Sequence, residues 1–319
     1  MPERLDAFTG PAAGLLTSVL WTATSLFFTA AARRIGPVVL NAFRISFAVL
    51  LLGVTHRCLS GAWLPEAVER QVVLLALSGV IGLSIGDQAL FVAFLDIGPR
   101  LAMLIMTTAP LFAALFGWLA LGETLHGLAW LAMILTIAGV AWVVLERPRT
   151  AVGERPPNRL RGAIMAFVGA ACQAGGLLLS KQGMGHGWLP EEQHMPPQTA
   201  TLIRMFFAAL AMLPILALYG RWRRRRAAAG VPSLRAGTRR AGFLLACCGA
   251  VTGPFLGVWM SLVASDRAPL AVAQTLCSLP PILILPFAVL VYHEHLSPRA
   301  VVGAAVAVAG TAMLFLQPP

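Results

Sequence analysis

The chain has 319 residues, of which 58% are hydrophobic and only 12% are charged. Soluble domains carry about 25% charged residues, so this composition excludes an ordinary soluble protein. The formal net charge of +11 comes almost entirely from arginine, but no nucleic-acid recognition motif accompanies it, so we expect no nucleic-acid partner.

Apolar runs of about 20 residues, the length that crosses a bilayer, recur along the whole chain. They are continuously apolar and do not alternate as barrel strands do, so they predict helices. In chain order, we predict ten transmembrane helices at residues 11–32, 38–56, 71–95, 99–121, 125–145, 162–181, 198–219, 240–262, 269–291 and 298–316. The expected fold class is an all-α polytopic membrane protein.

The second half of the chain repeats the first. Residues 86–123 (GDQALFVAFLDIGPRLAMLIMTTAPLFAALFGWLALGE) align without a gap with residues 257–294 (GVWMSLVASDRAPLAVAQTLCSLPPILILPFAVLVYHE), at an offset of 171 residues. Earlier in each half Arg44 aligns with Arg204, and the changes in offset fall in predicted loops. A hydrophobic chain made of two copies of one half is typical of transporters that bind substrate between the halves.

These alignments divide the chain into a first five-helix repeat at 11–145, a linker rich in Arg and Pro at 146–161, and a second five-helix repeat at 162–316. Because five is odd, the second copy enters the membrane from the opposite side, and the repeat is inverted. Of the Lys and Arg residues, 17 fall on the side of the linker and five on the side of the two termini. The positive-inside rule therefore places the linker in the cytoplasm and both termini outside.

The sequence resembles the drug/metabolite transporter superfamily, in its EamA-type ten-helix branch. The resemblance is carried by Trp21, by Arg44 and Arg204 early in two helices, and by three segments: SGVIGLSIGDQALFVAFLDIG, TTAPLFAALFGWLALGE and SLPPILILPFAVLVYHE. It implies a central cavity formed mainly by the first, third, fourth, sixth, eighth and ninth helices, and secondary transport, often export of small metabolites or amino acids. It also implies cytoplasmic termini, opposite to the charge count.

Asp87 is the main functional candidate. It lies inside the third predicted helix, where a charged carboxylate costs roughly 2.5–3.5 kcal/mol and usually faces a cavity or a basic partner. Its repeat mate is Val258, so the duplication does not require an acid there. The alternative is a helix-end carboxylate hydrated at the membrane surface. The adjacent Gln88 faces either the cavity or a neighbouring helix.

Arg44 and Arg204 lie one to two turns into their helices. They either extend toward the nearer membrane surface and brace the loops, or serve as counter-ions for Asp87 or for a substrate carboxylate. Trp21, Gln173, Trp259 and Gln274 are further candidates for substrate contact, although hydrogen bonding between helices explains the two glutamines equally well.

Pro110 and Pro281 are repeat mates inside the fourth and ninth predicted helices. Each lacks the N–H that would bond to the carbonyl four residues earlier, so each predicts a kink or hinge. Glu123 and Glu294 end these two helices, where capping or anchoring is the expected role and a coupling carboxylate is the alternative.

The six histidines lie at helix ends or in loops, in no spacing typical of a metal site, and no Walker motif occurs. We therefore expect no catalytic residue, metal or cofactor, and no enzymatic activity.

The predicted function is a secondary transporter, and specifically an exporter, of small organic metabolites such as amino acids, working by alternating access around a midplane cavity. The alternatives are a lipid-linked sugar flippase and a membrane-embedded lipid-modifying enzyme. The expected partners are a small-molecule substrate, the lipid bilayer of a bacterial-type inner membrane, protons as a candidate coupling ion, and at most a second copy of the chain.

The charge count makes a prediction about topology. A reporter domain fused after the last residue should report an extracytoplasmic location, because the arginine-rich loops are costly to translocate. Cysteines introduced at 221–240 should be protected from an impermeant reagent added outside intact cells. A cytoplasmic reporter signal would contradict the orientation and leave the helix count unchanged.

Overall fold

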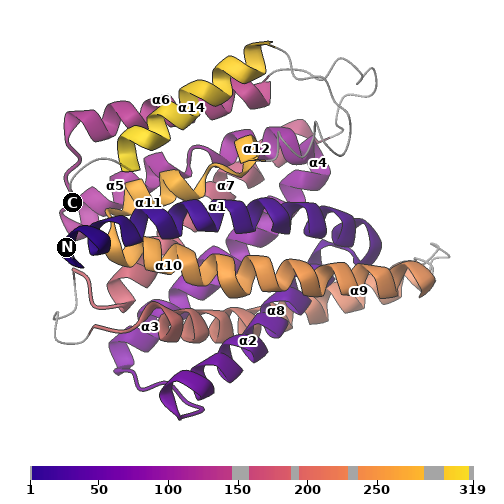
Figure 1. Ribbon diagram of the computed structural model, residues 1–319. Helices are drawn as coiled ribbons and strands as arrows, with labels where there is room; N and C mark the ends of the chain where they lie inside the picture. The colour runs from indigo at the N-terminus through magenta and orange to yellow at the C-terminus, as the bar shows by residue number, and fades with distance from the viewer. Residues whose placement is uncertain (1, 146–157, 188–193, 229–235, 284–297, 316–319) are drawn as a thin grey trace.

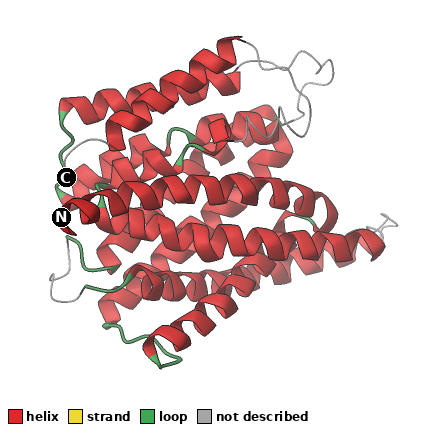
Figure 2. Ribbon diagram, viewed as in Figure 1, coloured by secondary structure: helices red, strands yellow, loops and turns green. Residues whose placement is uncertain are grey.

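The computed structural model describes residues 2–145, 158–187, 194–228, 236–283 and 298–315. Within these ranges the chain is almost entirely helical and contains no strand (Figure 2). Most of the predicted linker, up to residue 157, lies outside the described residues, as do the last part of the ninth predicted helix and Glu294.

Helices in the first half of the chain are α1 (Pro2–Ile35), α2 (Pro37–Ser60), α3 (Glu69–Ser78), the π-helix η1 (Gly79–Gly86), α4 (Asp87–Met106), α5 (Ala109–Leu121) and α6 (Gly127–Leu145). Those in the second half are α7 (Arg159–Gly183), α8 (Pro197–Ala228), α9 (Ala236–Ala250), the π-helix η3 (Val251–Gly257), α10 (Val258–Arg267), α11 (Leu270–Cys277), α12 (Pro280–Leu283) and α14 (Pro298–Phe315).

Six helical stretches are long and apolar enough to cross a membrane, namely Phe8–Ala32, Pro37–Ser60, Glu69–Phe94, Arg159–Gly183, Pro197–Arg221 and Arg239–Arg267. Four shorter apolar stretches, Ala109–Leu121, Gly127–Trp142, Leu270–Leu283 and Val301–Met313, coincide with the remaining predicted spans. The all-α polytopic fold is therefore confirmed. In Figure 1 the helices run side by side across the view, and α1 begins on the same side as α14 ends. We call that side the termini face, and the side where α6 ends and α7 begins the linker face.

The predicted boundary between the third and fourth spans lies inside α4, which is helical throughout. The chain nevertheless reverses within it. A Cβ atom built on Gly169 would lie 3.6 Å from Leu90 and 3.4 Å from Met106. In a straight helix these two residues would be about 24 Å apart along the axis. The two limbs of α4 therefore cross the bundle in opposite directions, as the two predicted spans require.

The outer surface of the bundle carries large apolar side chains that would be unfavourable in water. Leu50, Trp118, Ile134 and Val308 are all exposed. An apolar surface of this kind is expected where a protein faces lipid. Small buried residues on the inner faces, in contrast, bring the helix backbones close together, and α6–α14 and α4–α7 form the most extensive helix pairs.

Contacts between α6 and α14 are reciprocal. A Cβ atom on Gly139 would lie 2.5 Å from the backbone nitrogen of Ala307, and one on Gly310 would lie 2.7 Å from that of Thr136. Gly139 and Gly310 are repeat mates, and so are Thr136 and Ala307. Contacts that exchange partners in this way are produced by a two-fold relation. Because the two helices run antiparallel, the two-fold axis is perpendicular to them, as an inverted repeat requires.

Two π-helical segments occupy matching places in the halves, and the sequence analysis did not anticipate them. The η1 segment ends at Gly86 and the η3 segment at its mate Gly257. In each case the next residue bonds to the carbonyl five positions earlier: Asp87 N–H to Gly82, and Val258 N–H to Gly253. Such local widening of a helix is frequent at functional sites, and here it immediately precedes Asp87.

Candidate functional site

A cavity of about 240 Å³ lies between the two halves. It extends toward the linker face, since its lining includes Ala32 near the end of α1 and Pro37 at the start of α2. Six of the eight predicted substrate or ion candidates line it, and so does one of the two predicted kink residues: Trp21, Arg44, Asp87, Gln173, Arg204, Gln274 and Pro281.

The remaining three candidates do not line the cavity. Gln88 is the neighbour of Asp87 on α4, and its buried Oε1 has no hydrogen-bond partner among the described residues. Trp259 packs against Phe255, with the ring centroids 6.2 Å apart. Pro110 is buried at the start of α5. Successive residues of a helix point about 100° apart, so the side chains next to Asp87 and Val258 are directed elsewhere.

An ion pair between Asp87 and Arg44 forms the centre of the cavity wall. Arg44 Nη2 donates to Asp87 Oδ2, and the two side chains are only 7% and 19% exposed. Arg44 Nε also donates to Asn41 Oδ1 at 2.9 Å, one turn earlier on α2. Arg44 therefore points inward and compensates the charge of Asp87, and does not extend to the membrane surface.

Aromatic rings hold the Arg44 guanidinium on two further sides. Its carbon lies 5.4 Å from the ring centroid of Phe28 and 5.3 Å from that of Phe91. Both distances are within the range of cation–π attraction, which is strongest where water is excluded. With Asn41 and Asp87 as hydrogen-bond partners, the guanidinium is fixed in one orientation.

Arg204, the repeat mate of Arg44, is almost completely buried and also lines the cavity. Its guanidinium packs closely against two glycines: a Cβ atom on Gly82 would lie 2.6 Å from Arg204 Nη2, and one on Gly176 would lie 3.1 Å from it. Asp87 interacts with it electrostatically. Arg204 Nε has no hydrogen-bond partner among the described residues. Two guanidinium groups and one carboxylate leave this part of the cavity wall with a net positive charge.

The other walls combine apolar and neutral polar side chains. Leu83, Leu90, Phe94, Met103 and Met106 supply apolar surface. The neutral polar groups include Gln274, whose Oε1 is buried without a partner among the described residues. The smaller polar groups that line the cavity are Thr24, Ser25, Thr107, Ser261 and Ser278.

Both prolines mark breaks in their helices at matching positions. The α4 helix ends at Met106 and α5 begins three residues later, at Ala109, with Pro110 in its first turn. In the second half α11 ends at Cys277, and Pro281 lies in the first turn of α12. In both cases the residue that ends the helix is the one four positions before the proline. Thr107 and Ser278, which lie in these breaks, line the cavity.

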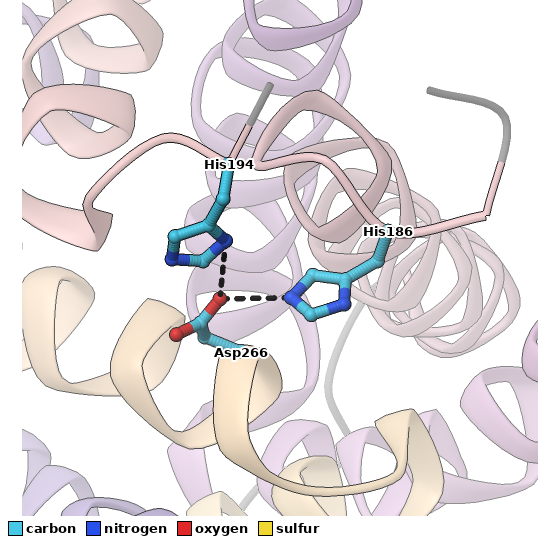
Figure 3. A group of neighbouring side chains, drawn as sticks. All are labelled: His186, His194 and Asp266. Atoms are coloured by element: carbon cyan, nitrogen blue, oxygen red, sulfur yellow. Dashed lines mark hydrogen bonds and ion pairs between the residues drawn. The ribbon is translucent and has the colours of Figure 1, made fainter. Parts of the chain in front are cut away.

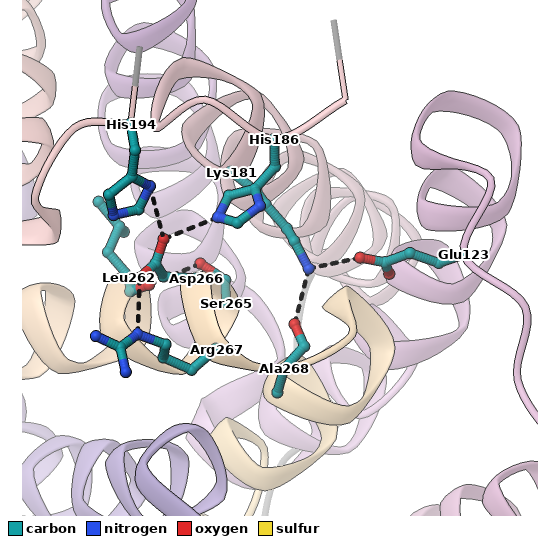
Figure 4. A network of polar contacts seen from close by, with 9 residues as sticks. All are labelled: Glu123, Lys181, His186, His194, Leu262, Ser265, Asp266, Arg267 and Ala268. Carbon is teal, nitrogen blue, oxygen red and sulfur yellow. Dashed lines mark hydrogen bonds and ion pairs between the residues drawn. The ribbon is translucent and has the colours of Figure 1, made fainter. Parts of the chain in front are cut away.

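A polar network joins the two halves on the termini face (Figure 4). Lys181 Nζ, at the end of α7, donates to Glu123 Oε1 at 2.5 Å and to the carbonyl of Ala268 at 2.8 Å. Glu123 Oε2 accepts the N–H of Leu270 at 2.7 Å, so it caps α11 in the other half of the chain and not its own helix. We call Lys181, Glu123, Ala268 and Leu270 the latch.

Sequence reasoning did not identify the latch, although Lys181 aligns with Arg33 as a basic residue that ends the first helix of each repeat. On the linker face a different ion pair joins the halves. Arg161 Nε and Nη2 donate to the two carboxylate oxygens of Asp96, each at 2.6 Å. The Asp96–Arg161 pair and the latch therefore join the two halves on opposite faces of the bundle.

An inverted two-fold relation, a cavity between the halves and buried charges at its wall define the chain as a polytopic membrane protein with a transporter-type fold. The family model of the EamA-like transporter family matches residues 8–145 and again 160–316. The chain therefore belongs to the EamA-like transporter family, within the drug/metabolite transporter superfamily.

No curated protein matches the chain. Among solved structures, one described only as "Crystal structure of protein" is similar over 95% of this chain and 95% of its own, with a TM-score of 0.70 and 18% sequence identity. A likeness at that identity supports the fold alone.

The latch gives a prediction about access to the cavity. Glu123→Gln leaves the Lys181 ammonium buried without its counter-charge, which should cost up to about 3–5 kcal/mol and loosen the termini face. In a cysteine-free background carrying Ser278→Cys, an impermeant thiol reagent added from the termini face should label Glu123→Gln faster than the parent.

Asp96→Asn is the matched control, because it removes one carboxylate charge from the ion pair on the linker face. It should leave labelling from the termini face unchanged. Equal labelling rates in the parent and in Glu123→Gln would show that the latch does not close that side.

Proposed function

We propose that the chain is a secondary transporter that exports small organic solutes bearing a carboxylate, with amino acids as the simplest case, by alternating access. The observation that carries the proposal is Arg204. A buried guanidinium that lines a cavity, beside a second arginine and a single carboxylate, is matched by a carboxylate, which accepts charge-assisted hydrogen bonds from arginine.

An amino acid fits the rest of the site as well. Its carboxylate would bind Arg204, and its ammonium group would bind the carboxylate of Asp87, which is already oriented by Arg44. The side chain of the solute would lie against Leu90, Met103 and the neighbouring apolar wall. This arrangement satisfies each buried charge, as a low-dielectric site requires.

The size of the cavity favours small solutes over the alternatives. At about 240 Å³ it is smaller than the roughly 300–1,000 Å³ typical of pockets for drug-sized ligands. A lipid-linked sugar would need a larger site that opens sideways into the bilayer. A lipid-modifying enzyme would need nucleophilic or acid–base groups beside a cleft that admits a lipid, whereas the charged groups that line this cavity suit a small charged solute.

Asp87 supplies a means of coupling transport to protons. A proton on Asp87 removes the acceptor for the solute's ammonium group, so proton and solute would occupy the site in turn. Each would then be carried in its own direction as the cavity opens to one face and then the other. An inward proton gradient across a bacterial-type inner membrane would drive export.

The orientation predicted by the charge count is compatible with export, because a solute to be exported would enter the cavity from the cytoplasm. The cavity extends toward the linker face, which carries most of the arginines and would lie in the cytoplasm. The latch would then close the outer side in the state described here. The proposal applies equally to a monomer and to a homodimer, since the cavity is formed within one chain.

Flux in proteoliposomes tests the proposal. The purified protein should accumulate a labelled amino acid against its gradient when a proton gradient is imposed, within a panel that includes amino acids and simple carboxylates. Asp87→Asn should abolish this accumulation, because Asn cannot carry a proton. It should also slow exchange of labelled for unlabelled solute, because Asn, like protonated Asp87, offers no charge to the ammonium group.

Glu69→Gln, an exposed acid at the start of α3, is the matched control and should behave as the parent. Normal uphill accumulation by a well-folded Asp87→Asn variant would remove Asp87 from coupling. Absence of flux for every carboxylate-bearing solute in the panel would overturn the substrate class.

A further inference from the structure

Two histidines and an aspartate meet on the termini face, outside the cavity (Figure 3). His186 Nε2 donates to Asp266 Oδ1 at 2.8 Å, and His194 Nδ1 lies 3.8 Å from the same oxygen. His186 and His194 follow α7, whereas Asp266 lies near the end of α10. One ligand atom from each residue lies within 4.8 Å of the other two.

The distances between these atoms suit a small tetrahedral ion. Zn²⁺ binds imidazole nitrogen and carboxylate oxygen at about 2.0–2.2 Å, so adjacent ligand atoms lie roughly 3.3–3.5 Å apart. To bind such an ion, His186 Nε2 and Asp266 Oδ1 would have to move apart by about half an ångström. His194 Nδ1 would have to move closer to Asp266 Oδ1. The His194 side chain is 48% exposed and free to make that movement.

Backbone contacts hold the two histidines together independently of their side chains. Met195 N–H donates to the carbonyl of Met184 at 2.9 Å, which fixes the residue after His194 beside the end of α7. His186 N–H donates to the carbonyl of Lys181 at 3.3 Å. These two hydrogen bonds hold His186 and the residue after His194 beside the end of α7, which brings the ligand atoms close.

Asp266 is oriented as metal-binding carboxylates usually are. Its side chain is only 2% exposed, and its second oxygen accepts a hydrogen bond from Arg267 Nε at 3.2 Å. Such a partner fixes the direction of the ligating oxygen. The positive charge of Arg267 also opposes a bound cation, so the site is suited to reversible occupancy and not to a permanent structural metal.

We propose that His186, His194 and Asp266 form a binding site for a divalent transition metal ion of the Zn²⁺ class. Imidazole ligands select Zn²⁺ and related ions over Mg²⁺ and Ca²⁺, which prefer oxygen. To bind, His186 turns from its Nε2–H to its Nδ1–H tautomer, so that Nε2 offers its lone pair to the metal. The ion then replaces the hydrogen bond from His186 to Asp266.

The position of this site gives it a role in closing the termini face. His186 is bonded through its backbone to Lys181, and Asp266 lies two residues before Ala268, the carbonyl that Lys181 contacts. Figure 4 shows the three metal-ligand residues beside the latch. A metal ion that joins the end of α7 to the end of α10 would therefore hold the latch closed. Metal binding does not depend on the proposed transport; this closing role does.

Binding is tested on the purified full chain in detergent, stripped of metal by a chelator. Zn²⁺ titrated by calorimetry should fill one saturable site, and Co²⁺ in its place should give the visible absorption of tetrahedral coordination. His194→Ala should weaken Zn²⁺ binding about 10-fold or more and abolish the Co²⁺ absorption. Because this side chain is half exposed, the variant should fold normally and melt as the parent does in chelator.

His126→Ala is the matched control, because His126 is an exposed histidine on the same face, after α5. It should keep the affinity of the parent. Absence of saturable Zn²⁺ binding, or equal affinity in His194→Ala and the parent, would overturn the site.

Hydrogen exchange tests the closing role separately from any transport assay. Saturating Zn²⁺ should slow amide exchange at residues 184–187 and 268–270 in the parent and not in His194→Ala. Unchanged exchange in a parent that binds Zn²⁺ would overturn the closing role.

Discussion

The carboxylate of Asp87 lies between two apolar halves, far from either end of the α3–η1–α4 run, and the Arg44 guanidinium compensates its charge there. An unpaired carboxylate at that depth would be protonated or would cost several kcal/mol. The arrangement around it follows from this constraint: Asn41 and two aromatic rings hold Arg44, and η1 widens the helix just before Asp87. Replacing a buried ion pair by apolar residues is often neutral or stabilising. Stability alone therefore does not explain why the pair is there, whereas the proposed binding of a charged solute would.

Symmetry and its violation have separate roles in this structure. The duplication places glycines, proline breaks and π-helical segments at matching positions, so each half can bend in the same places. The two cavity arginines follow the duplication, because Arg44 corresponds to Arg204. Asp87 does not: it corresponds to Val258, so the first half alone supplies a carboxylate to the cavity wall. The duplication therefore accounts for the helix breaks, the π-helical segments and the paired arginines, but not for the carboxylate of Asp87.

The sequence was most informative where a residue violates a simple rule. A charge inside an apolar run identified Asp87, paired prolines identified the two helix breaks, and the constant offset identified the repeat. Contacts between segments that lie far apart in the sequence left no comparable pattern in the sequence. Capping or anchoring at the end of its helix was the expected role of Glu123, and nothing in the sequence indicated that it caps α11, whose first residue lies 147 positions later. His186, His194 and Asp266 have no metal-site spacing, because the fold alone brings α10 to the segment after α7. Gln88 and Trp259 were selected for their residue types, but their positions around the helix direct their side chains away from the cavity.

A double-mutant cycle on Arg44 and Asp87 tests most directly the claim that their ion pair organises the cavity. The free energy of unfolding would be measured in mixed micelles for Arg44→Met, Asp87→Leu and the double variant. Each single variant leaves one buried charge unpaired and should lose about 3–5 kcal/mol, while the double variant should lose much less than the sum of the two. Additive losses would mean that the two charges do not depend on each other and would contradict the account.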